Sequence, residues 1–71
     1  MDRMPVESST LKSIGYDPET STLEVEFRRG AIYQYFDVPP DVYAQLMSAS
    51  SHGQFFVHHI RNHFPTRHVL T

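Results

Sequence analysis

The clearest hydrophobic pattern lies in the middle of the chain. Leu23, Val25 and Phe27 alternate with charged residues, which is the two-residue period of a strand with one buried face. Gly30 then turns the chain into a second segment that is rich in aromatic residues, Ala31 to Val38. The pattern therefore predicts a β-hairpin.

The loop of this hairpin determines which way the side chains point. A three-residue loop needs a positive φ only at its glycine, whereas a two-residue loop would force Arg29 into that region as well. We therefore expect the three-residue loop, which places Tyr33 and Tyr35 on the buried face. The same register leaves Ile32 and Phe36 on the more exposed face.

A further strand and two helices flank the hairpin. The segment from Ser8 to Tyr16 predicts a strand with a bulge, because its two leading apolar residues would otherwise face opposite sides. Pro39-Pro40 favours the start of a helix that ends near Ala49. Ser51 has the S-x-x-Q spacing of a capping box and predicts a second helix, roughly His52 to Asn62. The buried side of this second helix is expected to carry Phe56, Val57, Ile60 and Phe64.

Together these elements predict an α+β fold with the order β-β-β-α-α. A small three-stranded antiparallel sheet is followed by two short helices that pack on one face. A chain of 71 residues forms one domain. We expect an ordered core of about residues 6–64, with residues 1–5 and 66–71 flexible.

Composition narrows the class of protein. The chain has no Cys, which excludes a disulfide framework and a thiolate metal site. It has no apolar run that would serve as a signal peptide or as a membrane span of about 20 residues. We therefore expect a cytoplasmic protein that does not associate with membranes.

Charge is distributed unevenly along the chain. The net charge is −2 with His neutral, which argues against strong non-specific binding of nucleic acid. All acidic residues lie at or before Asp41, and the rest of the chain carries Arg61, Arg67 and every His. The C-terminal part is therefore mildly cationic, and it becomes more so as the pH falls toward about 6.

Several short motifs occur in an order that resembles a known family. They are Ser8-Ser9, Ile14-Gly15-Tyr16-Asp17, Leu23-x-Val25-x-Phe27-x-x-Gly30, Tyr33-x-Tyr35, Val38-Pro39, Val42-Tyr43, Ala49-x-Ser51-x-Gly53-x-Phe55-Phe56 and Ile60-Arg61. In this order and spacing they make residues 6–62 similar to the KTSC domain family, a short module named after the C-terminus of some lysyl-tRNA synthetases. The resemblance implies a free-standing small protein of a bacterial or phage type. It implies no established activity, and it suggests RNA as a partner.

Aromatic and basic residues form a candidate nucleic-acid surface. Tyr33 and Tyr35 could stack on bases, as aromatic residues do in single-strand binders. Arg28, Arg29 and Arg61 could contact phosphates. The same residues also fit ordinary roles, which are half-buried packing for the tyrosines and solubilising charge for the arginines.

The start of the second helix is a further candidate. Ser51 and Gly53 lie where free backbone N–H groups and the helix dipole favour an anion. Gly53 would also let a ligand approach closely. The alternative is a plain helix cap between the two helices.

Metal binding and catalysis have little support. His59 and His63 have the i, i+4 spacing of a zinc pair, but no Cys or acidic residue follows as a third ligand. The chain has no Gly-rich phosphate loop, no nucleophile elbow and no carboxylate pair in a plausible pocket. We expect no metal, no cofactor, no small-molecule substrate and no enzyme activity.

Two functional interpretations remain. The first is a small accessory module that binds RNA through the arginines, the tyrosines and the start of the second helix. The second is a module for protein interaction or self-association as a homodimer, which would use Ile32, Phe36 and Phe55 as an exposed apolar patch. The family resemblance favours the first.

Overall fold

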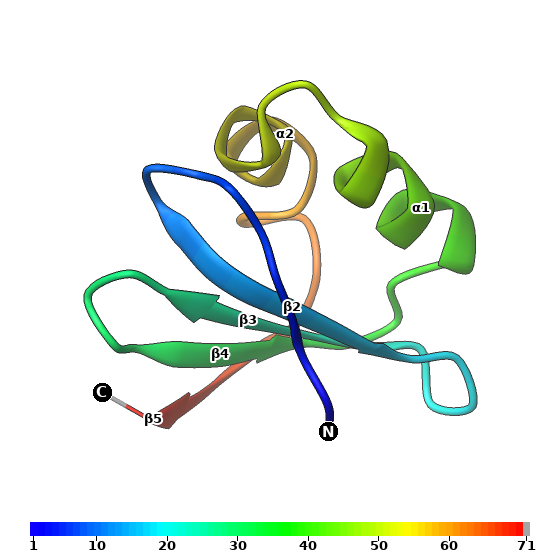
Figure 1. The fold of residues 1–71 in the computed structure, drawn as a ribbon. Helices are drawn as coiled ribbons and strands as arrows, with labels where there is room; N and C mark the ends of the chain where they lie inside the picture. Colours follow the sequence, from blue (N-terminus) through cyan, green and yellow to red (C-terminus); the bar gives the residue numbers. More distant parts are fainter. Residues whose placement is uncertain (71) are drawn as a thin grey trace.

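The computed structural model describes residues 1–70, and its sheet has five strands rather than the three predicted (Figure 1). The strands are β1 (Met4–Pro5), β2 (Leu11–Asp17), β3 (Thr22–Phe27), β4 (Ile32–Tyr35) and β5 (Thr66–Leu70). They lie in the order β1-β2-β3-β4-β5, and all neighbours are antiparallel. Two helices, α1 (Pro40–Ser48) and α2 (His52–His59), follow β4 and cover one face of the sheet. The α+β class is therefore confirmed, and the strand count was wrong.

The β3–β4 hairpin has the predicted register. Val25 lies opposite Tyr33, and Leu23 lies opposite Tyr35. Gly30 has a φ of 100° in the loop, so the left-handed conformation falls on the residue that has no Cβ. The two tyrosines consequently face the helices, on what we call the inner face of the sheet.

Strand β2 contains the predicted bulge. Its register shifts between Leu11 and Ser13, so that Leu11 and Ile14 are both fully buried. The core lies between the inner face and the helices. It consists of Leu11, Ile14, Leu23, Val25, Tyr35, Val38, Leu46, Phe56 and Ile60.

The two additional strands come from segments that were expected to lie outside the ordered core. In β1, Pro5 stands on an outer strand, where its missing N–H removes no central pairing bond. In β5, which pairs with β4, every residue is exposed. Because no residue of β5 is buried, its sequence lacks the alternation that predicts a strand. The flexibility expected of both ends stays a prediction, and Thr71 lies outside the described residues.

The second helix is shorter than predicted. Its N-cap is confirmed, since the Oγ of Ser51 accepts a hydrogen bond from the N–H of Gln54 at 3.2 Å. It ends at His59, and Asn62 then takes a φ of 66° as the chain turns back toward β5. Val57 is 45% exposed and does not line the buried side. Neither helix is long and apolar enough to cross a membrane.

The predicted exposed patch does not form around Ile32. This residue is only 8% exposed. It lies opposite Glu26 of β3 and Leu70 of β5, so the unpredicted fifth strand pairs with the edge of β4. Phe36 and Phe55 are half-buried, and Phe55 packs against the core.

Candidate nucleic-acid pocket

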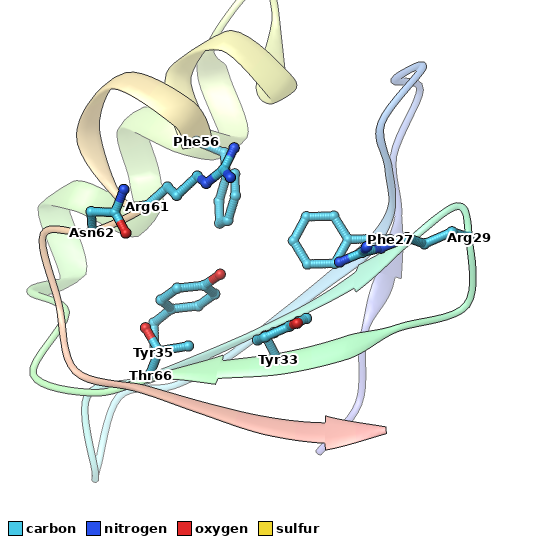
Figure 2. Close-up of a pocket in the computed structure, with 8 residues that line it drawn as sticks. All are labelled: Phe27, Arg29, Tyr33, Tyr35, Phe56, Arg61, Asn62 and Thr66. Carbon is cyan, nitrogen blue, oxygen red and sulfur yellow. The ribbon is translucent and has the colours of Figure 1, made fainter. Parts of the chain in front are cut away.

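A pocket of about 420 Å³ opens between the inner face of the sheet and the end of α2 (Figure 2). Its lining consists of Phe27, Arg29, Tyr33, Tyr35, Phe56, Arg61, Asn62 and Thr66. Tyr35 and Phe56 are buried at its floor, whereas Arg29 and Arg61 are exposed at its rim. The pocket therefore combines an aromatic floor with a cationic rim.

The aromatic rings of the floor hold one another in place. The ring of Phe56 meets those of Phe27 and Tyr35 edge to face, with both centroid distances at 5.4 Å. Phe27 also meets Tyr33 edge to face at 5.7 Å. Because edge-to-face pairs are favoured by the ring quadrupoles, this floor is formed before any ligand arrives.

One face of Tyr33 is already covered by the protein. The imidazole of His68 stacks on it, with the ring centroids 4.4 Å apart and the planes within 1° of parallel. His68 belongs to β5 and is exposed. A base that stacked on this face of Tyr33 would have to displace the imidazole.

The two arginines of the rim come from opposite ends of the pocket. Arg29 belongs to the hairpin loop, and its guanidinium carbon lies 5.6 Å from the centroid of the Phe27 ring. Arg61 follows α2 and extends beside Phe56 (Figure 2). Within residues 1–70 the ion pairs involve only Arg3 and Lys12 as cations. The charges of Arg29 and Arg61 are therefore not neutralised by a described carboxylate.

The hydroxyl of Tyr35 stays protonated at neutral pH. Burial, with a smaller contribution from the neighbouring Tyr33, raises the pKa of Tyr35 to about 12, while Arg61 and Arg29 act in the opposite direction. A tyrosine in free solution has a pKa of about 10. The group is therefore a neutral hydrogen-bond donor that lies within the field of two cations.

The structure brings together four of the seven predicted nucleic-acid-binding residues, which are Arg29, Tyr33, Tyr35 and Arg61. Arg28 points elsewhere, since its Nε donates to the carbonyl of Ser8 at 2.5 Å. Ser51 and Gly53 line a separate pocket of about 370 Å³ that is rich in hydroxyl groups. No arginine or lysine lines that second pocket, and the Oγ of Ser51 is engaged in the helix cap.

The structure does not place the predicted histidine pair on one helix. Since α2 ends at His59, His63 does not continue the same helix face. The ring of His59 instead packs against Phe55, with centroids 4.5 Å apart. Within residues 1–70, no group of three His, Asp or Glu side chains could hold a metal ion.

Four pocket residues were not predicted as site residues. Phe27 and Phe56 were assigned to the core, where they do pack, but their ring edges also reach the pocket. Asn62 was placed inside a helix and Thr66 in a flexible tail. Only the turn after α2 and the return of β5 bring these last two to the pocket, and neither feature has a clear local pattern.

The elements and the pocket define a small α+β domain in which an antiparallel sheet packs on two helices. The KTSC domain family matches residues 7–64. The chain belongs to this family.

Relatives include both small proteins and larger enzymes. An uncharacterised protein of Stutzerimonas stutzeri is 52% identical over 56 residues, which is 79% of each chain. A lysine–tRNA ligase of Nostoc punctiforme is 43% identical over 58 residues, which is 82% of this chain and 10% of the ligase. The crystal structure of a KTSC domain protein from Yersinia pestis superimposes with a TM-score of 0.94 at 44% identity, over 96% of each chain. The same domain thus occurs alone and as a small part of a tRNA ligase.

Proposed function

We propose that this chain is a small accessory module that binds RNA through the pocket between the sheet and α2. The observation that carries the proposal is the convergence of Arg29 and Arg61, without a described carboxylate partner, on an aromatic floor. Arginines bind phosphates, and aromatic rings contact bases. The similarity to a segment of a lysine–tRNA ligase supports RNA as the ligand.

The charge of the chain favours a local contact with single-stranded RNA. A duplex is recognised over many phosphates by an extended basic surface. This protein has a net charge of −2 and concentrates two cations at one pocket. A single strand can direct one nucleotide into such a pocket, because its bases and its ends are free to turn outward.

The test is a fluorescence-anisotropy titration of a labelled mixed-sequence RNA of eight nucleotides at several salt concentrations. The pocket variant is Arg29→Gln/Arg61→Gln. A matched control is Lys12→Gln/Arg67→Gln, which removes the same charge from two exposed residues that do not line the pocket. We expect the negative slope of log K against log salt to be shallower by about 1.4 in the pocket variant, because each phosphate that an arginine no longer neutralises accounts for about 0.7.

The control variant should retain most of the affinity and of the salt slope. Equal reductions in the two variants would show that only net charge matters and would refute the pocket as the binding site. Failure of the wild type to bind with any salt dependence would refute RNA binding itself.

The alternative, a self-association surface, has less support. Ile32 is buried, so it does not join Phe36 and Phe55 in one exposed apolar patch. Phe55 is in turn partly covered by His59 and by the core. We therefore keep RNA as the proposed partner.

A further inference from the structure

The hydroxyl of Tyr35 faces the pocket without a hydrogen-bond partner among residues 1–70. The residue is 5% exposed, yet none of the hydrogen bonds formed by side chains within residues 1–70 involves this hydroxyl. Every fully buried side-chain oxygen in the same residues has a hydrogen-bond partner. Because the Tyr35 oxygen has none, it is not fully buried. Figure 2 shows it pointing from the floor into the open space below Arg61 and Phe56. A ligand in the pocket can therefore reach it.

Tyr16, which is half-buried, shows what a tyrosine hydroxyl does when its role is structural. Its hydroxyl donates to the carbonyl of Val38 at 2.5 Å, and its ring stacks on Tyr43 at 4.7 Å. Buried hydroxyls are normally satisfied in this way. The hydroxyl of Tyr35, in contrast, points into a pocket lined by two arginines and has no acceptor among residues 1–70.

The donors around the pocket match an anion with several oxygen atoms. Tyr35 offers a neutral O–H at the floor, and Arg29 and Arg61 offer charged N–H groups at the rim. Charge-assisted hydrogen bonds to phosphate are the strongest that such groups form. The buried position of Tyr35 restricts the ligand. A ligand group that reaches the floor must project from the rest of the ligand.

We infer that the pocket receives the terminal phosphate of an RNA strand, an inference that rests on the proposed function. An internal phosphodiester carries a nucleoside on both sides and one negative charge, so it suits the exposed arginines of the rim better than the buried hydroxyl of the floor. A terminal phosphate monoester has three free oxygens and a charge of about −1.5 to −2 at neutral pH. It can accept from Tyr35 at the floor, and its charge attracts the arginines of the rim.

The test uses three RNAs of eight nucleotides with one sequence, which carry a 5′-phosphate, a 3′-phosphate or hydroxyls at both ends. Affinities are measured for the wild type, Tyr35→Phe and the matched control Tyr16→Phe. We expect the wild type to bind one phosphorylated RNA about tenfold more tightly than the unphosphorylated one. Tyr35→Phe should lose most of that preference, and Tyr16→Phe should keep it. Cooperative urea unfolding of each variant verifies that it folds.

Each contrary result has a separate meaning. Salt-sensitive binding of all three RNAs with equal affinity would overturn the terminal phosphate and leave the proposed function intact. A preference that survives in Tyr35→Phe would overturn the assignment of this hydroxyl to the ligand. A phosphoserine peptide that binds more tightly than phosphorylated RNA would assign the pocket to a modified protein and overturn the inference. Failure to bind any RNA would overturn both proposals together.

Discussion

Buried polar groups on the outer face of the sheet are paired with other side chains, whereas the buried hydroxyl of Tyr35 on the inner face is not, within residues 1–70. On the outer face, Glu24 is 6% exposed, and its carboxylate is paired with Arg3 and accepts from the amide of Gln34 at 2.9 Å. Ser13, 7% exposed, donates to Glu26 at 2.8 Å. On the inner face, the hydroxyl of Tyr35 points into the pocket and has no such partner in the part of the chain that the structure describes.

Burial alone therefore does not separate structural polar groups from candidate ligand contacts, whereas pairing does. The outer face resembles a completed network, because β1 brings Arg3 to the carboxylates of Glu24 and Glu26. On the inner face, the hydroxyl of Tyr16 is paired with Val38, whereas that of Tyr35 has no partner among the described residues. Substitutions on the outer face should thus change stability, and substitutions in the pocket should change binding more than stability.

The largest effect is expected for Glu24→Ala. This change leaves Arg3 without its closest acidic partner and Gln34 without its acceptor. Breaking a largely buried pair of this kind should lower the free energy of unfolding by about 3 kcal/mol. Urea denaturation measures the loss, and Glu19→Ala, at an exposed turn position, is the control. A loss within about 0.5 kcal/mol of the control would mean that the outer network is not structural.

On the inner face, the ionisation of Tyr35 should lower the stability of the fold at high pH. In the unfolded chain Tyr35 ionises near pH 10, whereas in the folded protein burial raises its pKa to about 12. The raised pKa contributes stability that is complete below pH 10 and is lost as the pH rises from 10 to 12. Between pH 8 and about 11.5, the wild type should lose about 2 kcal/mol more than Tyr35→Phe. Parallel pH profiles of the two proteins would contradict a raised pKa of Tyr35.

The sequence predicted the parts of the fold that have a buried face of their own. The alternation of Leu23, Val25 and Phe27 and the glycine at position 30 were enough for the hairpin and its register. They were not enough for β5, which is a strand only because β4 offers an open edge for pairing. Ile32, which was expected on the more exposed face, is buried in the strand to which β5 pairs.

The site was predicted in part for a similar reason. Arg29, Tyr33 and Tyr35 are close in sequence, so the hairpin alone brings them together. Arg61 reaches them only through the packing of α2 on the sheet. Ser51 and Gly53 satisfied a local rule for anion binding, but the fold places them at another pocket. Local patterns therefore identified candidate groups, and tertiary packing determined which of them meet.

A smaller effect is expected for Gly15→Ala on the outer face. A Cβ at this position would lie 2.5 Å from the carbonyl oxygen of Asp2, so the N-terminal segment would have to move and Arg3 with it. We expect a loss of about 1–2 kcal/mol in urea denaturation. Gly53→Ala is the control, because its Cβ would meet only ordinary contacts at 3.5 Å and α2 would gain helix propensity. Equal stabilities for the two variants would show that the N-terminal segment does not fix the outer network.

The smallest effect is expected where the pocket meets β5. His68→Ala removes the ring that stacks on Tyr33, and an exposed stacked pair contributes about 0.5–1 kcal/mol. The free energy of unfolding should fall by no more than that amount, with His63→Ala as an exposed control. Faster amide hydrogen exchange confined to β5 would locate the loss, because the stack holds this outer strand against β4. The variant should retain its affinity for RNA or bind more tightly, since the face of Tyr33 that the imidazole covers becomes free for a base. A loss of RNA binding in His68→Ala would instead make the imidazole part of the binding site and would place β5 among the elements that contact the ligand.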